Sequence, residues 1–335
     1  MSFETNVSTR MARGESLYAL ELLPVVEQAA IESAKVMGNG DREEADQAAT
    51  TAMRTAMDLC DIDGTIVIGE GERDEAPMLY IGERVGRADS PHKVDIAVDP
   101  LEGTNLCAMG ANGAITVMAV AETGGLIHAP DIYMEKLVVP ARAKGHVRLE
   151  DPIGETVATV AECLQLKVTE IVAIVLDRPR HDETIAGLRA AGARVKLIGD
   201  GDLSAAISAA VRGTGVHMVV GIGGAPEGVI TAAAMKCLGG EILGRFRPRN
   251  DEERSRCLRM GVDPEKIYTT EELAPGENIV FLASGVTPGD LLRGVDLFGR
   301  GARVNSICMA YASSYIQFVD SIHMEDRSKA PHILR

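Results

Sequence analysis

The sequence of 335 residues contains no tryptophan, and aromatic residues make up only 3% of it. Proteins that bind single-stranded nucleic acid stack bases on aromatic side chains, so this composition argues against that function. Basic residues are also few, because 34 Lys and Arg stand against 49 Asp and Glu, which gives a formal net charge of −15. So acidic a chain is a poor partner for nucleic acid or an anionic membrane. Small acidic ligands remain open where local basic residues or bound cations offset this charge.

The six cysteines form no CxxC pair. Their wide spacing is typical neither of a zinc cluster nor of a small disulfide scaffold. We therefore expect reduced thiols and a cytoplasmic protein.

Long apolar runs are absent as well, and none approaches the roughly 18 residues that span a membrane. The first residues, MSFETNVSTRMARGES, have no apolar core behind their arginines. We therefore expect neither a membrane span nor a secretory signal.

The overall amino-acid composition is typical of a globular protein, with 46% hydrophobic and 25% charged residues. At about 150 residues per domain, the length predicts two domains. The first half places helices before strands, which favours an α+β arrangement. In this half we expect helices over residues 24–37 and 43–59, strands over 65–68 and 94–98, and a hairpin between 115–121 and 125–127.

From about residue 151 onward, apolar strands alternate with helical patterns. This alternation is typical of a parallel sheet with both faces covered, so the fold class is α/β overall. The predicted domains are residues 1–155 and 156–335. Residues 304–324 indicate two further strands, which can pair with either domain. The expected strands cover residues 171–176, 194–198 and 217–222, and the expected helices cover 183–191, 203–211 and 226–238.

Each of these three strands ends in a polar cluster, at residues 177–181, 199–202 and 223–227. Open α/β sheets bind ligands at the carboxyl ends of their strands, so we expect the three clusters to line one crevice. Arg178 and Arg180 would then face a ligand in this crevice. The alternative interpretation is that they belong to a basic turn exposed to solvent.

An acidic motif, DPLEGTN, follows the strand at 94–98. Pro100 and Gly103 allow the chain to turn, so that Asp99, Glu102 and the Thr104 hydroxyl converge. Such hard oxygen ligands suit Mg²⁺ or Mn²⁺. The alternative is an ordinary acidic turn.

A second acidic cluster, GEGERDEAP, follows the strand at 65–68. Two further carboxylates are weaker candidates when taken singly. Asp46 lies in a helix of small residues and could simply be solvated. Glu227 follows Pro226 in a first helical turn, where the helix dipole alone favours an acidic residue.

Six motifs follow one another along the sequence: GDREEAD (40–46), IVIGEGERDEAPMLYIGE (66–83), DPLEGTN (99–105), DIYM (131–134), DRPRH (177–181) and GIGGAPEG (221–228). In this order, the chain from about residue 23 to residue 324 resembles class II fructose-1,6-bisphosphatase. DPLEGT alone indicates only the wider lithium-sensitive, inositol-monophosphatase-like phosphatase superfamily, so the ordered set carries the resemblance.

The resemblance implies a layered sugar-phosphatase fold and a phosphoric monoester hydrolase of gluconeogenesis and central carbon metabolism. The implied reaction is metal-dependent hydrolysis of the 1-phosphate of fructose 1,6-bisphosphate to fructose 6-phosphate, with Mn²⁺ or Mg²⁺ as cofactor. The implied partners are a small-molecule sugar bisphosphate and further copies of the chain, as a dimer or tetramer.

The resemblance also assigns roles to positions of this sequence. Asp74 and Thr104 match the catalytic pair that activates water. The matching metal ligands are Asp46, Glu70, Asp99, Glu102 and Glu227. The matching substrate contacts are Glu102, Gly103, Thr104, Tyr133, Arg178, Pro179, Arg180, Asp200, Gly201, Asp202 and Gly224.

Two positions depart from many relatives: Arg42 stands where a lysine is common, and Glu102 stands where some carry aspartate. Arg42 keeps the charge but changes the geometry, and is a possible additional site residue. Tyr133 could equally be a packing residue. Two alternative functions stay open: a bifunctional enzyme that also hydrolyses sedoheptulose 1,7-bisphosphate, and a non-catalytic sugar-phosphate sensor. The Asp74/Thr104 pair argues against the sensor, since sensing needs no activated water.

Overall fold

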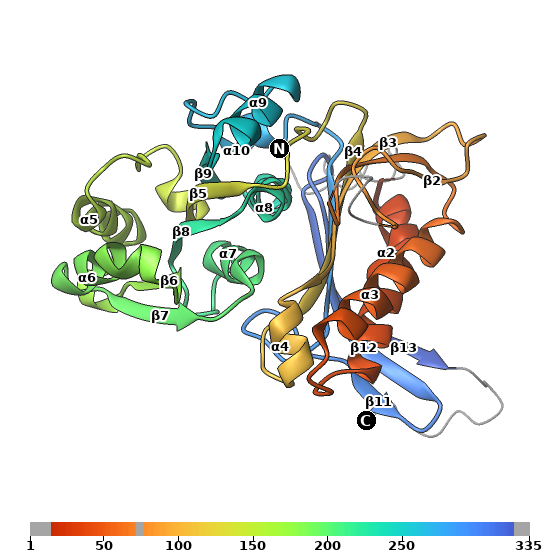
Figure 1. The fold of residues 1–335 in the computed structure, drawn as a ribbon. Coiled ribbons are helices and arrows are strands. Elements are labelled where there is room, and N and C mark those ends of the chain that lie inside the picture. Colours follow the sequence, from red (N-terminus) through yellow and green to blue (C-terminus); the bar gives the residue numbers. More distant parts are fainter. Residues whose placement is uncertain (1–14, 72–76, 325–335) are drawn as a thin grey trace, which may run out of the picture.

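The computed structural model describes residues 15–71 and 77–324, whose strands form two sheets (Figure 1). The eight-stranded sheet, here called sheet A, has the order β11-β12-β10-β4-β3-β1-β2, and β13 pairs with β12. Within it, β1 and β3 run parallel and the other pairs are antiparallel. The strands are β1 (Asp63–Ile68), β2 (Arg84–Gly86), β3 (Lys93–Glu102), β4 (Ile115–Glu122), β10 (Val280–Gly285), β11 (Asp296–Phe298), β12 (Gly301–Ala310) and β13 (Tyr315–Met324).

The five-stranded sheet, here called sheet B, has the order β7-β6-β8-β5-β9. As the alternating pattern predicted, β6 runs parallel to both β7 and β8. Strand β5 lies antiparallel between β8 and β9. The strands are β5 (Tyr133–Val139), β6 (Val172–Leu176), β7 (Arg194–Ile198), β8 (Met218–Gly224) and β9 (Glu241–Arg247).

Helices and sheets alternate in layers (Figure 1). Helices α2 and α3 cover the outer face of sheet A, α7 and α8 lie between the sheets, and α5 and α6 cover the outer face of sheet B. The helices are α2 (Glu15–Lys35), α3 (Arg42–Met57), α4 (Thr104–Met109), α5 (Ile153–Leu164), α6 (Asp182–Ala190), α7 (Asp202–Ala210), α8 (Ala225–Leu238), α9 (Asp251–Arg259) and α10 (Thr270–Leu273).

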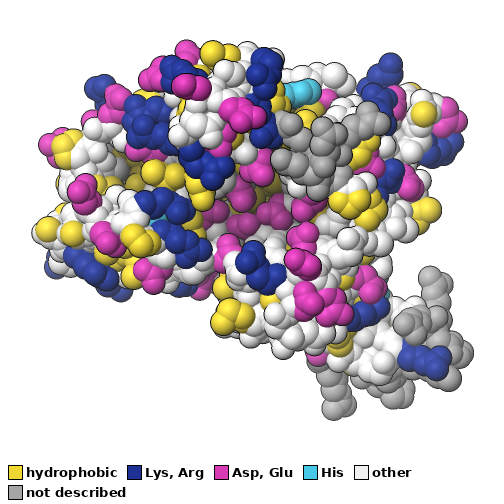
Figure 2. All heavy atoms as spheres, viewed as in Figure 1, with side chains coloured by type: hydrophobic (Ala, Val, Ile, Leu, Met, Phe, Trp, Pro, Cys, Tyr) yellow, Lys and Arg dark blue, Asp and Glu magenta, His cyan; other side chains and the backbone are white. Residues whose placement is uncertain are grey.

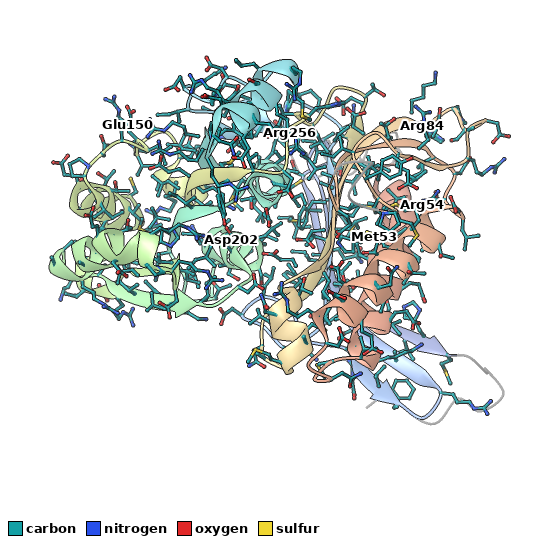
Figure 3. The ribbon with its side chains drawn as sticks, viewed as in Figure 1. Met53, Arg54, Arg84, Glu150, Asp202 and Arg256 are labelled. Carbon is teal, nitrogen blue, oxygen red and sulfur yellow. The ribbon has the colours of Figure 1, made fainter. Side chains whose placement is uncertain are left out.

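A separate apolar cluster fills each junction between layers. Met53 of α3 packs with Ile96 of β3 on the outer side of sheet A, and its position is labelled in Figure 3. Between the sheets, Ile230 of α8 packs with Phe281 of β10 and Ile174 of β6. This central cluster contains residues of both sheets, so its packing fixes the position of one sheet relative to the other. The layered α/β fold class is therefore confirmed.

Helix α2 begins well before the predicted start at residue 24, and Pro24 lies inside it. Proline normally favours the first turn, but Ala19, Leu22 and Leu23 are buried against the core and extend the apolar face upstream. Tertiary packing therefore outweighs the local proline signal, and the prediction for this boundary was wrong.

The predicted hairpin between residues 115–121 and 125–127 is also wrong, although β4 itself is present. Both edges of β4 are already paired, with β3 and with β10. Residues 125–127 instead bond to the α10 region, where Ile127 N–H donates to Leu273 O at 3.0 Å. A strand with two long partners has no edge left for a short third one.

The tail forms two strands, as predicted, and both join sheet A. Strand β5, which precedes residue 155, joins sheet B, whereas β10 to β13 come after residue 156 and join sheet A. Both sheets thus combine segments from before and after residue 155. The division into domains 1–155 and 156–335 stays a prediction. Among the described residues, every helix is too short or too polar to cross a lipid bilayer.

Candidate active site

A cavity of about 290 Å³ opens where the two sheets and the starts of several helices meet. Figure 2 shows acidic side chains gathered in a hollow of the surface, bordered by Lys and Arg side chains. The lining carries one basic side chain, Arg42, among the described residues. Its acidic side chains are Asp46, Glu70, Asp99, Glu102, Asp131, Asp200 and Glu227.

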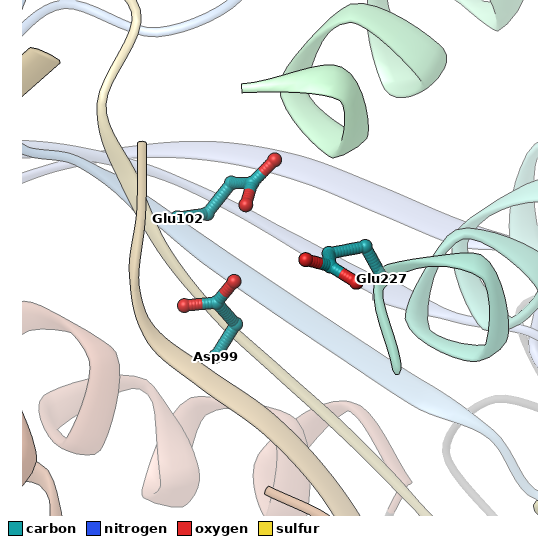
Figure 4. Close-up of side chains that lie close together, drawn as sticks. All are labelled: Asp99, Glu102 and Glu227. Atoms are coloured by element: carbon teal, nitrogen blue, oxygen red, sulfur yellow. The ribbon is translucent and has the colours of Figure 1, made fainter. Parts of the chain in front are cut away.

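Three of these carboxylates come close together. Asp99, Glu102 and Glu227 each offer an oxygen atom, and these atoms lie within 4.8 Å of one another (Figure 4). The pairing of β3 with β4 shifts register between Asp99 and Glu102, so that side chains three residues apart meet on one side of the strand. Glu227 approaches them from the first turn of α8. The proximity of all three predicted ligands makes this the candidate metal centre.

Backbone N–H groups orient two of these carboxylates. Leu101 N–H donates to Oδ1 of Asp99 at 3.1 Å, and Leu203 N–H, in the first turn of α7, donates to Oε1 of Glu102 at 2.9 Å. Oε2 of Glu227 is buried and has no hydrogen-bond partner among the described residues. A buried carboxylate oxygen without a donor is costly, and a bound cation would satisfy it. The donor set therefore fits a divalent metal with oxygen ligands.

Burial and mutual repulsion disfavour the charged forms of these groups. Burial, followed by the neighbouring carboxylates of Asp46, Asp131 and Glu227, raises the pKa of Glu70 to about 8. Burial raises the pKa of Glu227 to about 7, against the opposing charge of Lys136. Without bound cations, the site therefore holds protons that ordinary glutamates release.

Three further carboxylates of the cavity follow the same rule. Burial, and then the charge of Glu70, raises the pKa of Asp99 well above the usual range. Burial, and then the charge of Asp99, raises the pKa of Glu102 in the same way. Burial also raises the pKa of Asp46, while the charge of Arg42 partly offsets this effect. Bound divalent cations reverse the sign of such a field and keep the carboxylates ionised.

The structure brings all five predicted metal ligands to the lining of one cavity. Of the predicted catalytic pair, Thr104 lines the cavity, and its Oγ1 donates to Leu101 O at 2.9 Å. Asp74 lies outside the described residues. Gly103 is the N-cap residue before helix α4, which begins at Thr104. Its φ of 82° is a left-handed conformation that favours glycine.

The predicted substrate contacts divide into two groups. Gly103, Thr104 and Asp200 line the cavity together with Glu102. Asn105 Nδ2 holds Asp200 by donating to its Oδ2 at 2.9 Å. Gly201 is the N-cap residue before α7, and Gly224 is the N-cap residue before α8. The carboxylate of Asp202 lies 2.6 Å from the ammonium of a buried lysine, Lys136.

The two arginines among the predicted substrate contacts, Arg178 and Arg180, do not line this cavity but follow the end of β6. Pro179 lies between them in a short 3₁₀ turn, η3 (Pro179–His181). Arg178 donates to Gly199 O at 2.6 Å, and Arg180 donates to Ile222 O at 2.7 and 3.2 Å. Each guanidinium thus bonds to the end of a neighbouring strand. The ends of the three strands thus contact one another, but residues 177–181 do not line this cavity, so the expectation that the three clusters line one crevice stays a prediction.

Tyr133 is partly exposed, and two guanidinium groups lie close to its ring. Arg180 Cζ is 5.1 Å and Arg249 Cζ is 5.6 Å from the centre of its ring. These cation–π contacts place two positive charges near the ring. His181 is a neighbour that braces the turn, since it bonds to Leu176 O and to Ile222 N–H at 2.8 Å each.

Sequence reasoning missed four residues of this region. Asp131 and Asn105 line the cavity and belong to motifs that carried the resemblance, so their positions were the available signal. Lys136 occupies an inward position of a strand, where a charge is unusual. Arg249 follows β9 and carried no local signal, because only the fold brings it to Tyr133.

The layered fold and its carboxylate-lined cavity define the class of metal-dependent sugar phosphatases. Residues 16–323 match the family described as bacterial fructose-1,6-bisphosphatase, glpX-encoded, and the chain belongs to this family.

Several relatives are similar over nearly their whole length, and the three described here are named D-fructose 1,6-bisphosphatase class 2/sedoheptulose 1,7-bisphosphatase. The protein from Synechococcus sp. (strain JA-3-3Ab) is 49% identical over 92% of this chain and 95% of its own. Those from Trichodesmium erythraeum and Synechocystis sp. are each 48% identical, over 94% of this chain and 98% of their own.

Proposed function

We propose that this protein hydrolyses the 1-phosphate of fructose 1,6-bisphosphate, giving fructose 6-phosphate and phosphate, with Mg²⁺ or Mn²⁺. The observation that carries the proposal is the meeting of Asp99, Glu102 and Glu227 within 4.8 Å in a cavity lined by further carboxylates. Carboxylates alone repel a phosphate, so a phosphatase with this lining needs cations there.

In the proposed mechanism, divalent cations would be held by Asp99, Glu102 and Glu227, with Asp46 and Glu70 as further ligands. The bound cations would neutralise charge on the reacting phosphate and lower the pKa of the attacking water. Thr104, at the start of α4, and Asp74 would orient that water, and the Asp74 carboxylate would accept its proton. Asp200 accepts hydrogen bonds from sugar hydroxyls.

The second phosphate is held away from the breaking bond. Arg178 and Arg180 bind it as charged donors, and Tyr133 contributes its hydroxyl. Their guanidinium groups are already bonded to Gly199 O and Ile222 O, which reduces the entropy lost on binding. Arg42, at the cavity lining, adds a positive charge on the side of Asp46.

A second substrate is sedoheptulose 1,7-bisphosphate. Its support is the names of the three relatives described above, which include both bisphosphatase activities. Both sugars present the same 1-phosphate end to the carboxylates, so one centre serves both. We further propose a cytoplasmic homo-oligomer, and the six unpaired cysteines agree with a reducing compartment.

The test is phosphate release from fructose 1,6-bisphosphate, sedoheptulose 1,7-bisphosphate and fructose 6-phosphate, each with and without chelator. We expect release from the bisphosphates with Mg²⁺ or Mn²⁺, and none in excess chelator. Full activity in chelator would contradict the metal centre. Binding of the bisphosphates without any release would favour the sugar-phosphate sensor.

A further inference from the structure

A lysine lies buried in the layer between sheet B and the central helices. Lys136 is the fourth residue of β5, and its exposed fraction is 5%. It shares a strand face with Met134 and Val138, which belong to the central apolar cluster. Burying a charged side chain among apolar ones lowers the stability of the fold unless an opposite charge or a hydrogen-bond acceptor pairs with it. Lys136 is therefore expected to have such a partner.

Lys136 has two close partners, one from each central helix start. Its Nζ is 2.6 Å from Oδ2 of Asp202, the first residue of α7, and donates to the backbone oxygen of Gly224 at 3.0 Å. Gly224 is the N-cap residue that precedes α8. Figure 3 labels Asp202 in the interior of the molecule, beside sheet B. The ammonium therefore ties the starts of two helices to one strand.

Glycines surround the Lys136 side chain, and larger residues at their positions would leave it less space. Both cross-strand partners of Lys136 are glycines, Gly221 on β8 and Gly244 on β9. A Cβ on Gly223 would lie 2.9 Å from Nζ of Lys136 and would also strike Asp202. The glycine-rich end of β8 thus shapes a narrow space that the lysine fills.

Electrostatics favours a charged lysine here. Burial alone would lower the pKa of Lys136, but Asp202 and then Glu227 outweigh burial and raise it above the usual value. The same charge acts on Glu227 in the opposite sense and favours its ionised form.

We propose that Lys136 is a positioning residue for substrate: its ammonium fixes Asp202 and Gly224, and through them the sugar-binding segment that starts α7. This role rests on the proposed function and on the family resemblance, which matches both partners to substrate contacts. Lys136 engages Oδ2 of Asp202, and in this role Oδ1 would accept a hydrogen bond from a sugar hydroxyl. Lys136 itself does not line the cavity and touches no reacting atom.

The test compares Lys136→Met, Asp202→Asn and the double variant, with Lys236→Met as matched control. Lys236 is equally buried, with an exposed fraction of 6%, and donates to Ala274 O at 3.0 Å near the other end of α8. We expect Lys136→Met to raise KM for fructose 1,6-bisphosphate about 10- to 100-fold, because a charge-assisted contact is lost, with a smaller change in kcat. Lys236→Met should leave KM near that of the wild type.

Two further readouts separate positioning from general damage. The double variant should have a KM close to that of Asp202→Asn alone, since both changes break one contact. Mn²⁺ affinity, measured by calorimetry without substrate, should not fall in Lys136→Met, because removing a nearby positive charge favours a cation. A loosened site would instead lose Mn²⁺ affinity.

An unchanged KM in Lys136→Met, additive effects in the double variant or weakened Mn²⁺ binding would each overturn the role. If Lys136→Met does not fold, the double variant, which removes both charges of the Lys136–Asp202 pair, decides by the same comparison with Asp202→Asn. A wild-type protein inactive on every sugar bisphosphate would overturn the proposed function, and this role with it. Normal kinetics in Lys136→Met beside an active wild type overturn the role alone.

Discussion

The Nδ2 amide of Asn105 donates a 2.9 Å hydrogen bond to Oδ2 of Asp200, and so joins α4 of the sheet A side to the end of β7 in sheet B. The other carboxylate oxygen of Asp200 accepts from Gly201 N–H at 3.1 Å. Asp200 is therefore held at both oxygens, and both Asn105 and Asp200 line the cavity. The bond connects the candidate metal centre with the sugar-binding side.

Asn105→Ala should raise KM for fructose 1,6-bisphosphate about 3- to 10-fold, because Asp200 loses one of its two donors. The effect on kcat should be smaller, since Asn105 contacts no reacting atom. Steady-state kinetics provide the measurement. Asn305→Ala is the control, because it removes an amide-to-carboxylate bond between β12 and β13. An equal loss in both variants would show that only stability had changed.

Asp74→Asn should lower kcat about 10²-fold, because the amide is a poor acceptor for the proton of the attacking water. KM should change little. Thr104→Val should also lower kcat, and the two effects should not add if the side chains act on the same water. Asp89→Asn, at an exposed position, is the control. Near-normal turnover in Asp74→Asn would remove that residue from the chemistry.

Arg180→Ala should raise KM for fructose 1,6-bisphosphate about 10- to 150-fold, the range for loss of one charge-assisted contact. Contacts made equally in ground and transition states act mainly on KM. Hydrolysis of an ester without the second phosphate should be almost unchanged. Arg148→Ala, an exposed arginine, is the control. Equal loss of both activities, with a normal circular dichroism spectrum, would place Arg180 at the chemical centre.

The pH dependence of stability should change sign with metal. The pKa of Glu70 is about 8 in the folded chain against an ordinary 4.5. Between these values the folded chain holds a proton that the unfolded chain has released, so the free energy of unfolding falls as pH rises. Metal binds the ionised carboxylate and opposes this trend.

Glu70→Gln removes this contribution and tests it. In chelator, Tm of Glu70→Gln should rise relative to wild type by about 2 °C or more between pH 5 and pH 8. In Mn²⁺ the wild type should become the more stable protein at pH 8. Thermal denaturation provides the measurement, and Glu150→Gln, at an exposed position, is the control. A pH-independent difference in chelator would contradict the raised pKa.

Much of the candidate site could be read from short segments of sequence. The acidic motifs each follow a strand, and the structure places Glu70 and Asp99 in one cavity. The alternation in the second half correctly predicted the parallel strands β6, β7 and β8. Such features depend on residues close along the chain, where periodicity and turn chemistry act directly.

Other features could not be read in this way, because their partners are distant in sequence. Pro24 indicated a helix start, yet packing of Leu22 and Leu23 against the core extended α2 upstream. Residues 125–127 resembled a strand, but β4 had no free edge to offer. Lys136 interrupted an apolar row with no local sign of Asp202 as its partner.

The sequence by itself determined the chemistry of this protein: which carboxylates, arginines and glycines follow its strands, and the family to which their order belongs. Only the tertiary structure decided which of them meet. It brings Glu227 on α8 within 4.8 Å of Asp99 and Glu102 on β3, and it returns β10 to β13 to sheet A after the whole of sheet B. The physical reason is that strand patterns encode which face is buried, whereas partners are chosen by which edges and helix ends pack together.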